Sequence, residues 1–128
     1  MTGTNLIANT AGILSLISSL AVVHPIFFRT SQKNISYRKL IANISYTGLM
    51  LTICLGLVHG LLTTQMANIS YSDINTYWIY AGGLFVFNLF IFMAIAFPEL
   101  KHNFQKFNCF NYAILVLLVI HVGQKIVF

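Results

Sequence analysis

The sequence predicts an all-α polytopic membrane protein, a bundle of four transmembrane helices, and three observations lead to this fold class. The first is composition: 58% of the 128 residues are hydrophobic and 7% are charged, whereas a soluble domain carries charge at about a quarter of its positions. The second is a set of four apolar stretches, each long enough to cross ~30 Å of hydrocarbon at a helical rise of ~1.5 Å per residue. The third is the placement of the basic residues.

The four apolar stretches take up most of the chain, so we expect a single membrane domain over residues 1–128 and no separate soluble domain. The predicted spans run approximately over residues 6–28, 40–64, 77–97 and 108–128. In the first span, Pro25 removes a helical hydrogen bond and crowds the carbonyl four residues before it, which predicts unwinding near Ala21. The fourth span is the weakest, because polar residues interrupt it.

Basic residues follow the positive-inside pattern. They lie between the first and second spans and between the third and fourth, and the connection over residues 65–76 has none. In a four-span chain these two basic connections share one side of the membrane. We therefore expect both termini on the lumenal or periplasmic side. The net charge of +5 follows from this membrane pattern and does not indicate nucleic-acid binding. The residues concerned are Arg29, Lys33, Arg38, Lys39, Lys101 and Lys106.

Small and hydroxylic side chains recur at helical spacing on one face of the first span and one face of the second. Such faces allow the backbones of two membrane helices to approach closely. The predicted helix-packing residues are Ala8, Gly12, Ser15, Ser19, Ser45, Gly48, Thr52 and Gly56.

Two histidines stand on inward faces of different spans. His59 continues the small-residue stripe of the second span, and His121 shares a stripe of the fourth span with Asn111. Their depths differ by about five residues or less, an offset of at most roughly 7 Å at helical rise, so the pair is a candidate for axial ligation of a b-type haem. His24 and His102, both near the basic side, form a weaker candidate pair.

Other interpretations of these histidines stay open. One ring alone could ligate the magnesium of a chlorophyll, or each ring could hydrogen-bond a neighbouring helix and contribute ~0.6–2 kcal/mol to packing. If the rings bind iron, each needs an acceptor that orients it. The nearest candidates in sequence are Thr52, Thr63 and Asn111.

Other polar residues narrow the function classes. The acidic residues are Asp73, in the outer loop, and Glu99, at the basic end of the third span. Neither lies at mid-membrane, which argues against a proton- or cation-coupled carrier. No metal-binding Cys/His spacing, phosphate loop or nucleophile elbow is present. We therefore predict no catalytic residue and no metal cluster, and these absences argue against an enzyme.

We expect Cys54, Cys109 and Asn88 to be buried, the cysteines as free thiols.

Short motifs resemble a poorly characterised family of small four-helix membrane proteins from cyanobacteria. They are the His24-Pro25 pair, Arg38-Lys39 at the start of the second span, and the glycines around Gly56 and Gly60. The similarity continues from the Phe104-Gln105-Lys106-Phe107-Asn108 opening of the last span, through Asn111, to Gly123. The resemblance implies a photosynthetic-membrane setting and no particular activity.

The leading interpretation is a small non-catalytic subunit that packs on a larger membrane complex, which the resemblance would make a photosynthetic one. Its partners would be the lipid bilayer and other integral membrane subunits, with no nucleic acid. The alternatives are a b-type haem electron-transfer protein with His59 and His121 as ligands, or a pigment-binding subunit. We expect a multi-pass protein of the thylakoid or bacterial inner membrane, with haem b or chlorophyll as the candidate cofactors.

Overall fold

The computed structural model describes residues 3–26, 35–66 and 74–127, and over these residues the chain is entirely helical apart from short turns. Its helices are α1 (Gly3–Val23), α2 (Ile35–Met66), α3 (Ile74–Leu100) and α4 (Phe104–Val127), and a 3₁₀ turn, η1 (His24–Ile26), follows α1. Each of the four α-helices is long and apolar enough to cross a membrane. The prediction of an all-α fold with four span-length helices is therefore confirmed.

The end of α1 is set by Pro25. The proline nitrogen has no hydrogen to give to the carbonyl of Ala21, four residues earlier. In its place, Nδ1 of His24 contacts that carbonyl oxygen, and the Ser45 hydroxyl of α2 donates to it at 3.4 Å. The helix accordingly ends at Val23, before the predicted limit at residue 28. Residue 28 lies outside the described residues, as do Arg29, Lys33 and Asp73.

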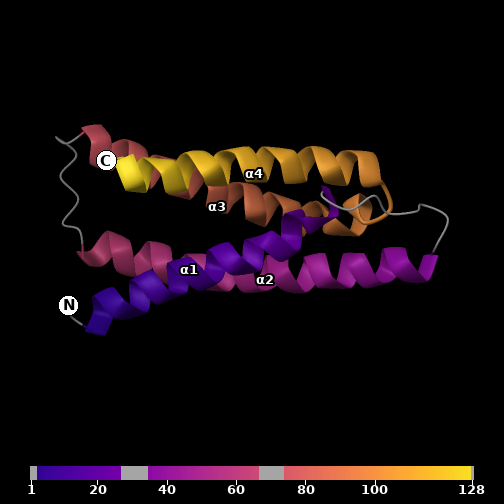
Figure 1. Ribbon diagram of the computed structural model, residues 1–128, viewed down its shortest axis with the longest axis horizontal. Coiled ribbons are helices and arrows are strands. Elements are labelled where there is room, and N and C mark those ends of the chain that lie inside the picture. Colours follow the sequence, from indigo (N-terminus) through magenta and orange to yellow (C-terminus); the bar gives the residue numbers. More distant parts are fainter. Residues whose placement is uncertain (1–2, 27–34, 67–73, 128) are drawn as a thin grey trace.

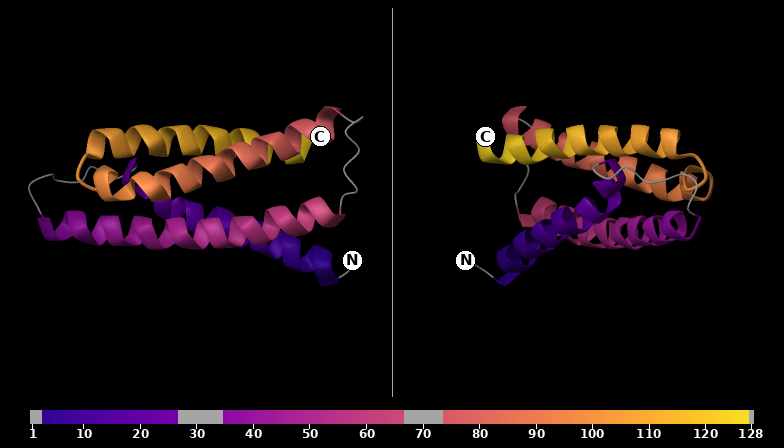
Figure 2. Two further views of the ribbon diagram at one scale, coloured as in Figure 1. Left: turned by 180° about the vertical axis from the view of Figure 1, so that it is seen from behind. Right: turned by 45° about the vertical axis from the view of Figure 1, so that its right-hand side comes forward.

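The four helices form two antiparallel hairpins, α1–α2 and α3–α4 (Figure 1). The packing of α1 on α2 is the most extensive in the bundle. In addition, α2 packs on α3 and α4 packs on α1, so α2 and α4 stand diagonally opposite each other. Both chain ends lie at one end of the bundle, and the two hairpins diverge toward that end (Figure 2). The bundle therefore has two unlike halves.

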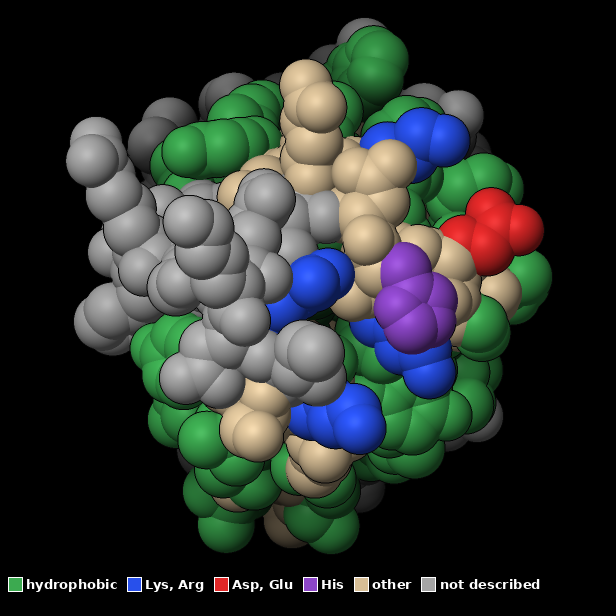
Figure 3. All heavy atoms as spheres, turned by 90° about the vertical axis from the view of Figure 1, so that its right-hand side faces the viewer, with side chains coloured by type: hydrophobic (Ala, Val, Ile, Leu, Met, Phe, Trp, Pro, Cys, Tyr) green, Lys and Arg blue, Asp and Glu red, His purple; other side chains and the backbone are tan. Residues whose placement is uncertain are grey.

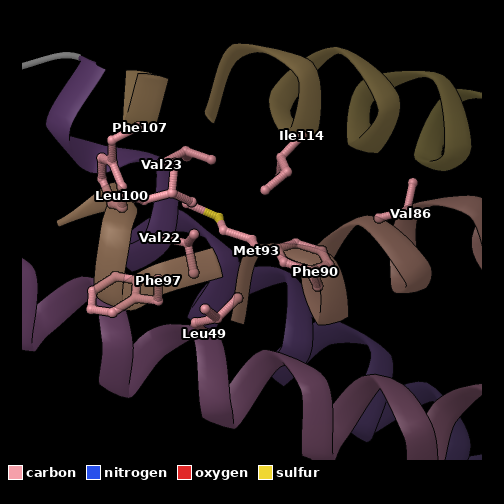
Figure 4. Close-up of a cluster of buried hydrophobic side chains, with 10 residues drawn as sticks. All are labelled: Val22, Val23, Leu49, Val86, Phe90, Met93, Phe97, Leu100, Phe107 and Ile114. Atoms are coloured by element: carbon pink, nitrogen blue, oxygen red, sulfur yellow. The ribbon is translucent and has the colours of Figure 1, made fainter. Parts of the chain in front are cut away.

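The hydrophobic core occupies the half away from the termini. Leu49, Met93 and Ile114 are fully buried there, and the ring of Phe97 packs on those of Tyr46 and Phe107, with centroids 5.1 and 6.0 Å apart. The core residues are Val22, Val23, Leu49, Val86, Phe90, Met93, Phe97, Leu100, Phe107 and Ile114 (Figure 4).

Lysine and arginine side chains gather over the end of this packed half (Figure 3). The exposed residues near this end of α2, α3 and α4 are Lys39, Glu99, Lys101, His102 and Lys106. The charged end of the bundle is thus the well-packed end, and the diverging end carries the termini.

Three predicted burials are wrong, because Cys54, Cys109 and Asn88 are all exposed. Only 17–28% of the residues in each span-length segment are buried inside the bundle, so most positions on each helix face outward. Asn88 lies two residues from the buried Phe90, and two residues on a helix correspond to about 200° of rotation. Polarity alone therefore does not decide which side a span residue faces.

Candidate functional site

The small-residue faces of α1 and α2 pack against each other. A Cβ atom added at Gly48 would lie 2.7 Å from Cβ of Ala21 and 2.9 Å from the carbonyl oxygen of Ser18, so these backbones approach as closely as glycine permits. The Ser15 hydroxyl donates to the carbonyl of Thr52 at 3.0 Å and ties the two helices together. Both faces are thereby occupied within the chain.

The other predicted packing residues lie along the same interface. Ala8, Ser19, Ser45 and Thr52 are buried, and Gly12 is half-buried. A Cβ at Gly56 would lie 3.4 Å from the Ser15 hydroxyl oxygen and 3.6 Å from the ring of Phe87 on α3. Position 56 therefore marks the place where α3 comes within reach of the α1–α2 hairpin.

Beyond this level the hairpins separate and border an open cavity of about 1020 Å³, lined by residues from all four helices. Its walls come from residues 9–19 of α1, 52–63 of α2, 79–90 of α3 and 118–122 of α4. Ligand pockets in proteins are usually ~300–1,000 Å³ and largely apolar, and this cavity is at the upper end of that range. Its floor is the edge of the core, because Val86 and Phe90 belong to both.

His59 is seated in the wall of this cavity by a contact with α1. Its Nδ1 lies 2.8 Å from the carbonyl oxygen of Ala8. A Cβ at Gly12 would be 2.7 Å from Nδ1 and 2.8 Å from Cε1, so the ring fits against α1 because position 12 has no side chain. Since a carbonyl only accepts hydrogen bonds, Nδ1 carries the hydrogen, and in the neutral form of the ring Nε2 would then keep its electron pair.

His121 lines the same cavity but is turned toward its own hairpin. A Cβ at Gly83 of α3 would be 2.9 Å from its Cε1 and 3.3 Å from its Nε2, so the tip of the ring rests on α3. A Cβ at Gly82 would meet the side-chain oxygen of Gln124 at 2.7 Å. The structure thus brings the two predicted histidines to one cavity, each ring placed over a glycine of the neighbouring helix.

The residues proposed to orient a ligating ring act elsewhere. The hydroxyl of Thr52 donates to the carbonyl of Gly48 at 2.7 Å, and that of Thr63 donates to the carbonyl of His59 at 2.5 Å. Asn111 is fully buried, and neither atom of its amide has a hydrogen-bond partner within the described residues. In their place, the Ala8 carbonyl orients the His59 ring, a contact for which a sequence holds no signal because every residue has such a carbonyl.

The weaker pair does not reach the cavity. His24 lies in η1 and contacts the Ala21 carbonyl, while His102 is exposed in the turn after α3. Sequence reasoning also missed Tyr80 of α3, whose hydroxyl donates to the carbonyl of Thr63 at 3.1 Å and links α3 to α2 at the cavity wall. Across the described parts of the chain, no three His, Cys, Asp or Glu side chains gather as a metal site.

Comparisons with protein families, with characterised proteins and with solved structures find no match to this chain. The resemblance to cyanobacterial membrane proteins stays a prediction, and the function is inferred from the geometry of the chain itself.

Proposed function

We propose that this chain is a membrane-spanning four-helix protein that binds a lipid-soluble small molecule between its two hairpins. The observation that carries the proposal is the cavity of about 1020 Å³ to which all four helices contribute. Ligand sites in helical bundles are built in this way, from side chains on facing helices.

The outward surface supports a location inside a lipid bilayer. Large apolar side chains are exposed on every helix. Among them are Ile13, Leu61, Leu84, Ile95 and Val119, which expose 57–75% of their area. A soluble monomer rarely exposes continuous apolar surface on this scale. In lipid such side chains need no protein partner.

The charge pattern supports one orientation in the membrane. Lys39, Lys101 and Lys106 lie at the packed end, which the positive-inside rule assigns to the cytoplasmic or equivalent side. Both termini and the cavity then belong to the lumenal or periplasmic half of the bilayer. A ligand held there would be within the apolar phase and close to the translocated surface.

The cavity combines apolar walls with a small number of polar groups. Phe87, Leu118 and Val122 are among the apolar lining residues. The polar lining residues are Asn9, Ser15, Ser19, Thr52, His59, Thr63, Tyr80 and His121. This is the usual composition of a small-molecule site, in which apolar area provides affinity and a few polar groups fix orientation.

The binding proposal can be tested by native mass spectrometry of the protein extracted from its own membrane in mild detergent. We expect the wild-type protein to retain a small molecule, and Gly56→Leu to lose it. A Cβ at position 56 would already contact the Phe87 ring at 3.6 Å, so the larger leucine side chain would displace that wall of the cavity. The matched control is Gly123→Leu, since a Cβ at Gly123 meets no atom within 4 Å and the residue does not line the cavity. Retention that is equal in both variants, or no retained molecule in the wild type, would contradict the proposal.

A second candidate function is the non-catalytic subunit of a larger membrane complex, favoured by the aromatic surface of α3. Trp78, Phe85 and Phe92 are each more than half exposed, and aromatic side chains are common in protein interfaces. Because the small-residue faces of α1 and α2 are occupied within the chain, this aromatic surface is the contact that such a complex would use. Extraction in mild detergent should then give a particle much larger than 14.4 kDa plus its micelle, and a single monomeric particle would exclude this candidate.

A further inference from the structure

Beyond a cavity for a lipid-soluble molecule, the geometry points to the chemical class of that molecule. We infer that Nε2 of His59 ligates the metal of a planar metallotetrapyrrole, of the haem or chlorophyll type, as its single axial protein ligand. This inference rests on the proposed binding function and adds the identity of the ligand and the atom that holds it.

The first argument is the hydrogen bond that fixes the imidazole. A metal-ligating histidine almost always donates its second ring N–H to a carboxylate, a backbone carbonyl or water, which fixes the tautomer and makes the ligating nitrogen more basic. His59 has this arrangement: Nδ1 lies 2.8 Å from the Ala8 carbonyl, and its side chain lines the cavity. The ring atoms nearest to position 12 of α1 are Nδ1, Cε1 and Cγ, so Nε2 lies farther from that position than the atoms that make the contact.

The second argument is the shape of the α2 surface around that ring. A macrocycle centred on Nε2 must extend over the neighbouring turns of the helix, where large side chains would obstruct it. One turn before His59 stands Gly56, and Gly60 and Thr63 follow on the other side, all three at the cavity. The Phe87 ring already covers Gly56, whereas a Cβ at Gly60 meets no atom within 4 Å, so the room for a flat ligand lies over Gly60.

The third argument separates a metallotetrapyrrole from other apolar ligands. A quinone carbonyl would need a hydrogen-bond donor at this place, but the Nδ1 hydrogen of His59 is already engaged by Ala8, and Nε2 offers only an electron pair. The complex of a divalent metal with a dianionic macrocycle is neutral overall. Its metal accepts an electron pair from an axial ligand such as Nε2.

The inference assigns one axial histidine where the sequence suggested a pair. The tip of the His121 ring, with its Nε2, rests on Gly83 of α3, so this ring serves the contact between α3 and α4. His59 then supplies one axial ligand, and the other axial position of the metal stays open to a small molecule or to none.

The test is a titration of the detergent-purified, ligand-depleted protein with iron protoporphyrin under reducing conditions and, separately, with magnesium protoporphyrin, followed by absorbance and fluorescence. The wild-type protein should give the spectrum of a five-coordinate imidazole complex. His59→Gln keeps an N–H that can reach the Ala8 carbonyl but lacks the ligating nitrogen, so binding should weaken at least about tenfold. In His59→Gly, added imidazole should restore the spectrum. His102→Ala is the matched control, because that ring is exposed and outside the cavity.

The outcomes separate the alternatives. Binding of the iron compound alone identifies a haem site, and binding of the magnesium compound alone identifies a chlorophyll-type site; both support the inference if they depend on His59. A six-coordinate spectrum that is lost equally in His59→Gln and His121→Ala would overturn single axial ligation. If the extracted protein retains a small molecule in a manner sensitive to Gly56→Leu, but neither compound gives a His59-dependent spectrum, the binding function stands and this inference fails. If the extracted protein retains no small molecule and neither compound gives a His59-dependent spectrum, both the proposed binding function and this inference fail.

Discussion

The closest approach of two helices in this protein gives its sharpest stability prediction. At Gly48, an added Cβ would be 2.7 Å from Cβ of Ala21 and 2.9 Å from the carbonyl oxygen of Ser18. Ordinary contact begins at 3.4 Å, and 3.4 Å less 2.7 Å leaves about 0.7 Å by which α1 must move away from α2. Neither atom is the end of a flexible side chain, so the strain cannot be relieved by a rotamer change. We therefore expect Gly48→Ala to separate the hairpin and destabilise the bundle.

The magnitude follows from two opposing terms. Inserting a methyl group into a well-packed contact costs about 1–3 kcal/mol, while replacing glycine by alanine within a helix gains up to about 1 kcal/mol of helix propensity. Gly60 lies on the same helix and has no atom within 4 Å of an added Cβ, so Gly60→Ala experiences the propensity term alone. The two variants should therefore differ by about 1–3 kcal/mol, which is roughly a five- to 150-fold difference in the unfolding equilibrium constant.

The assay is reversible unfolding in mixed micelles with increasing SDS, followed by circular dichroism. Gly48→Ala should unfold at a lower fraction of SDS than the wild type, and Gly60→Ala at the same fraction or a higher one. If Gly48→Ala were as stable as Gly60→Ala, the close α1–α2 contact described above would be incorrect.

Three further predictions concern the site, the core and the topology. Gly12→Ala should displace the His59 ring from α1 and weaken tetrapyrrole binding about 10–100-fold, as loss of an orienting hydrogen bond does; unchanged binding in the same titration would show that Gly12 does not seat the ring. Asn111→Leu should stabilise the protein by about 1–3 kcal/mol in the SDS assay, because it removes a buried amide without a hydrogen-bond partner; a loss of stability would reveal a partner for that amide. In a background without the native cysteines, Gly3→Cys and Ser36→Cys should react with a membrane-impermeant thiol reagent from opposite sides of the membrane, and reaction from one side would refute the four-span topology.

The two halves of the bundle differ in how much they contribute to its stability. The half under the basic end holds the core, where Leu49, Met93 and Ile114 are fully buried and carry the packing energy. In the other half α1 still packs on α2, where Ala8 is buried, but the Tyr80 hydroxyl joins the two hairpins by a single hydrogen bond to the Thr63 carbonyl. Hydrogen bonds of this kind contribute only about 0.6 kcal/mol each in membrane proteins. Stability is thus concentrated away from the cavity, which leaves the cavity half free to hold a ligand.

Much of the fold follows from the sequence alone. Four apolar stretches of span length predict four helices, because a helix is the element that satisfies its own backbone hydrogen bonds. Pro25 predicts the end of α1, since its missing N–H acts locally on the Ala21 carbonyl. The small-residue periodicity identifies positions such as Gly48 where helices can approach, because spacing along a helix fixes which residues share a face.

The tertiary structure alone decides how those faces are used. The two small-residue faces meet each other, the hairpins diverge above the core, and the resulting cavity joins His59 and His121 from diagonally opposite helices. It also decides that the His59 ring bonds the Ala8 carbonyl while the His121 ring rests on Gly83. The physical reason is that helical periodicity specifies a direction around one helix but not the neighbour found there. Ring orientation depends on the atoms of that neighbour, here a backbone carbonyl and two glycines, whose positions are set only when all four helices have packed.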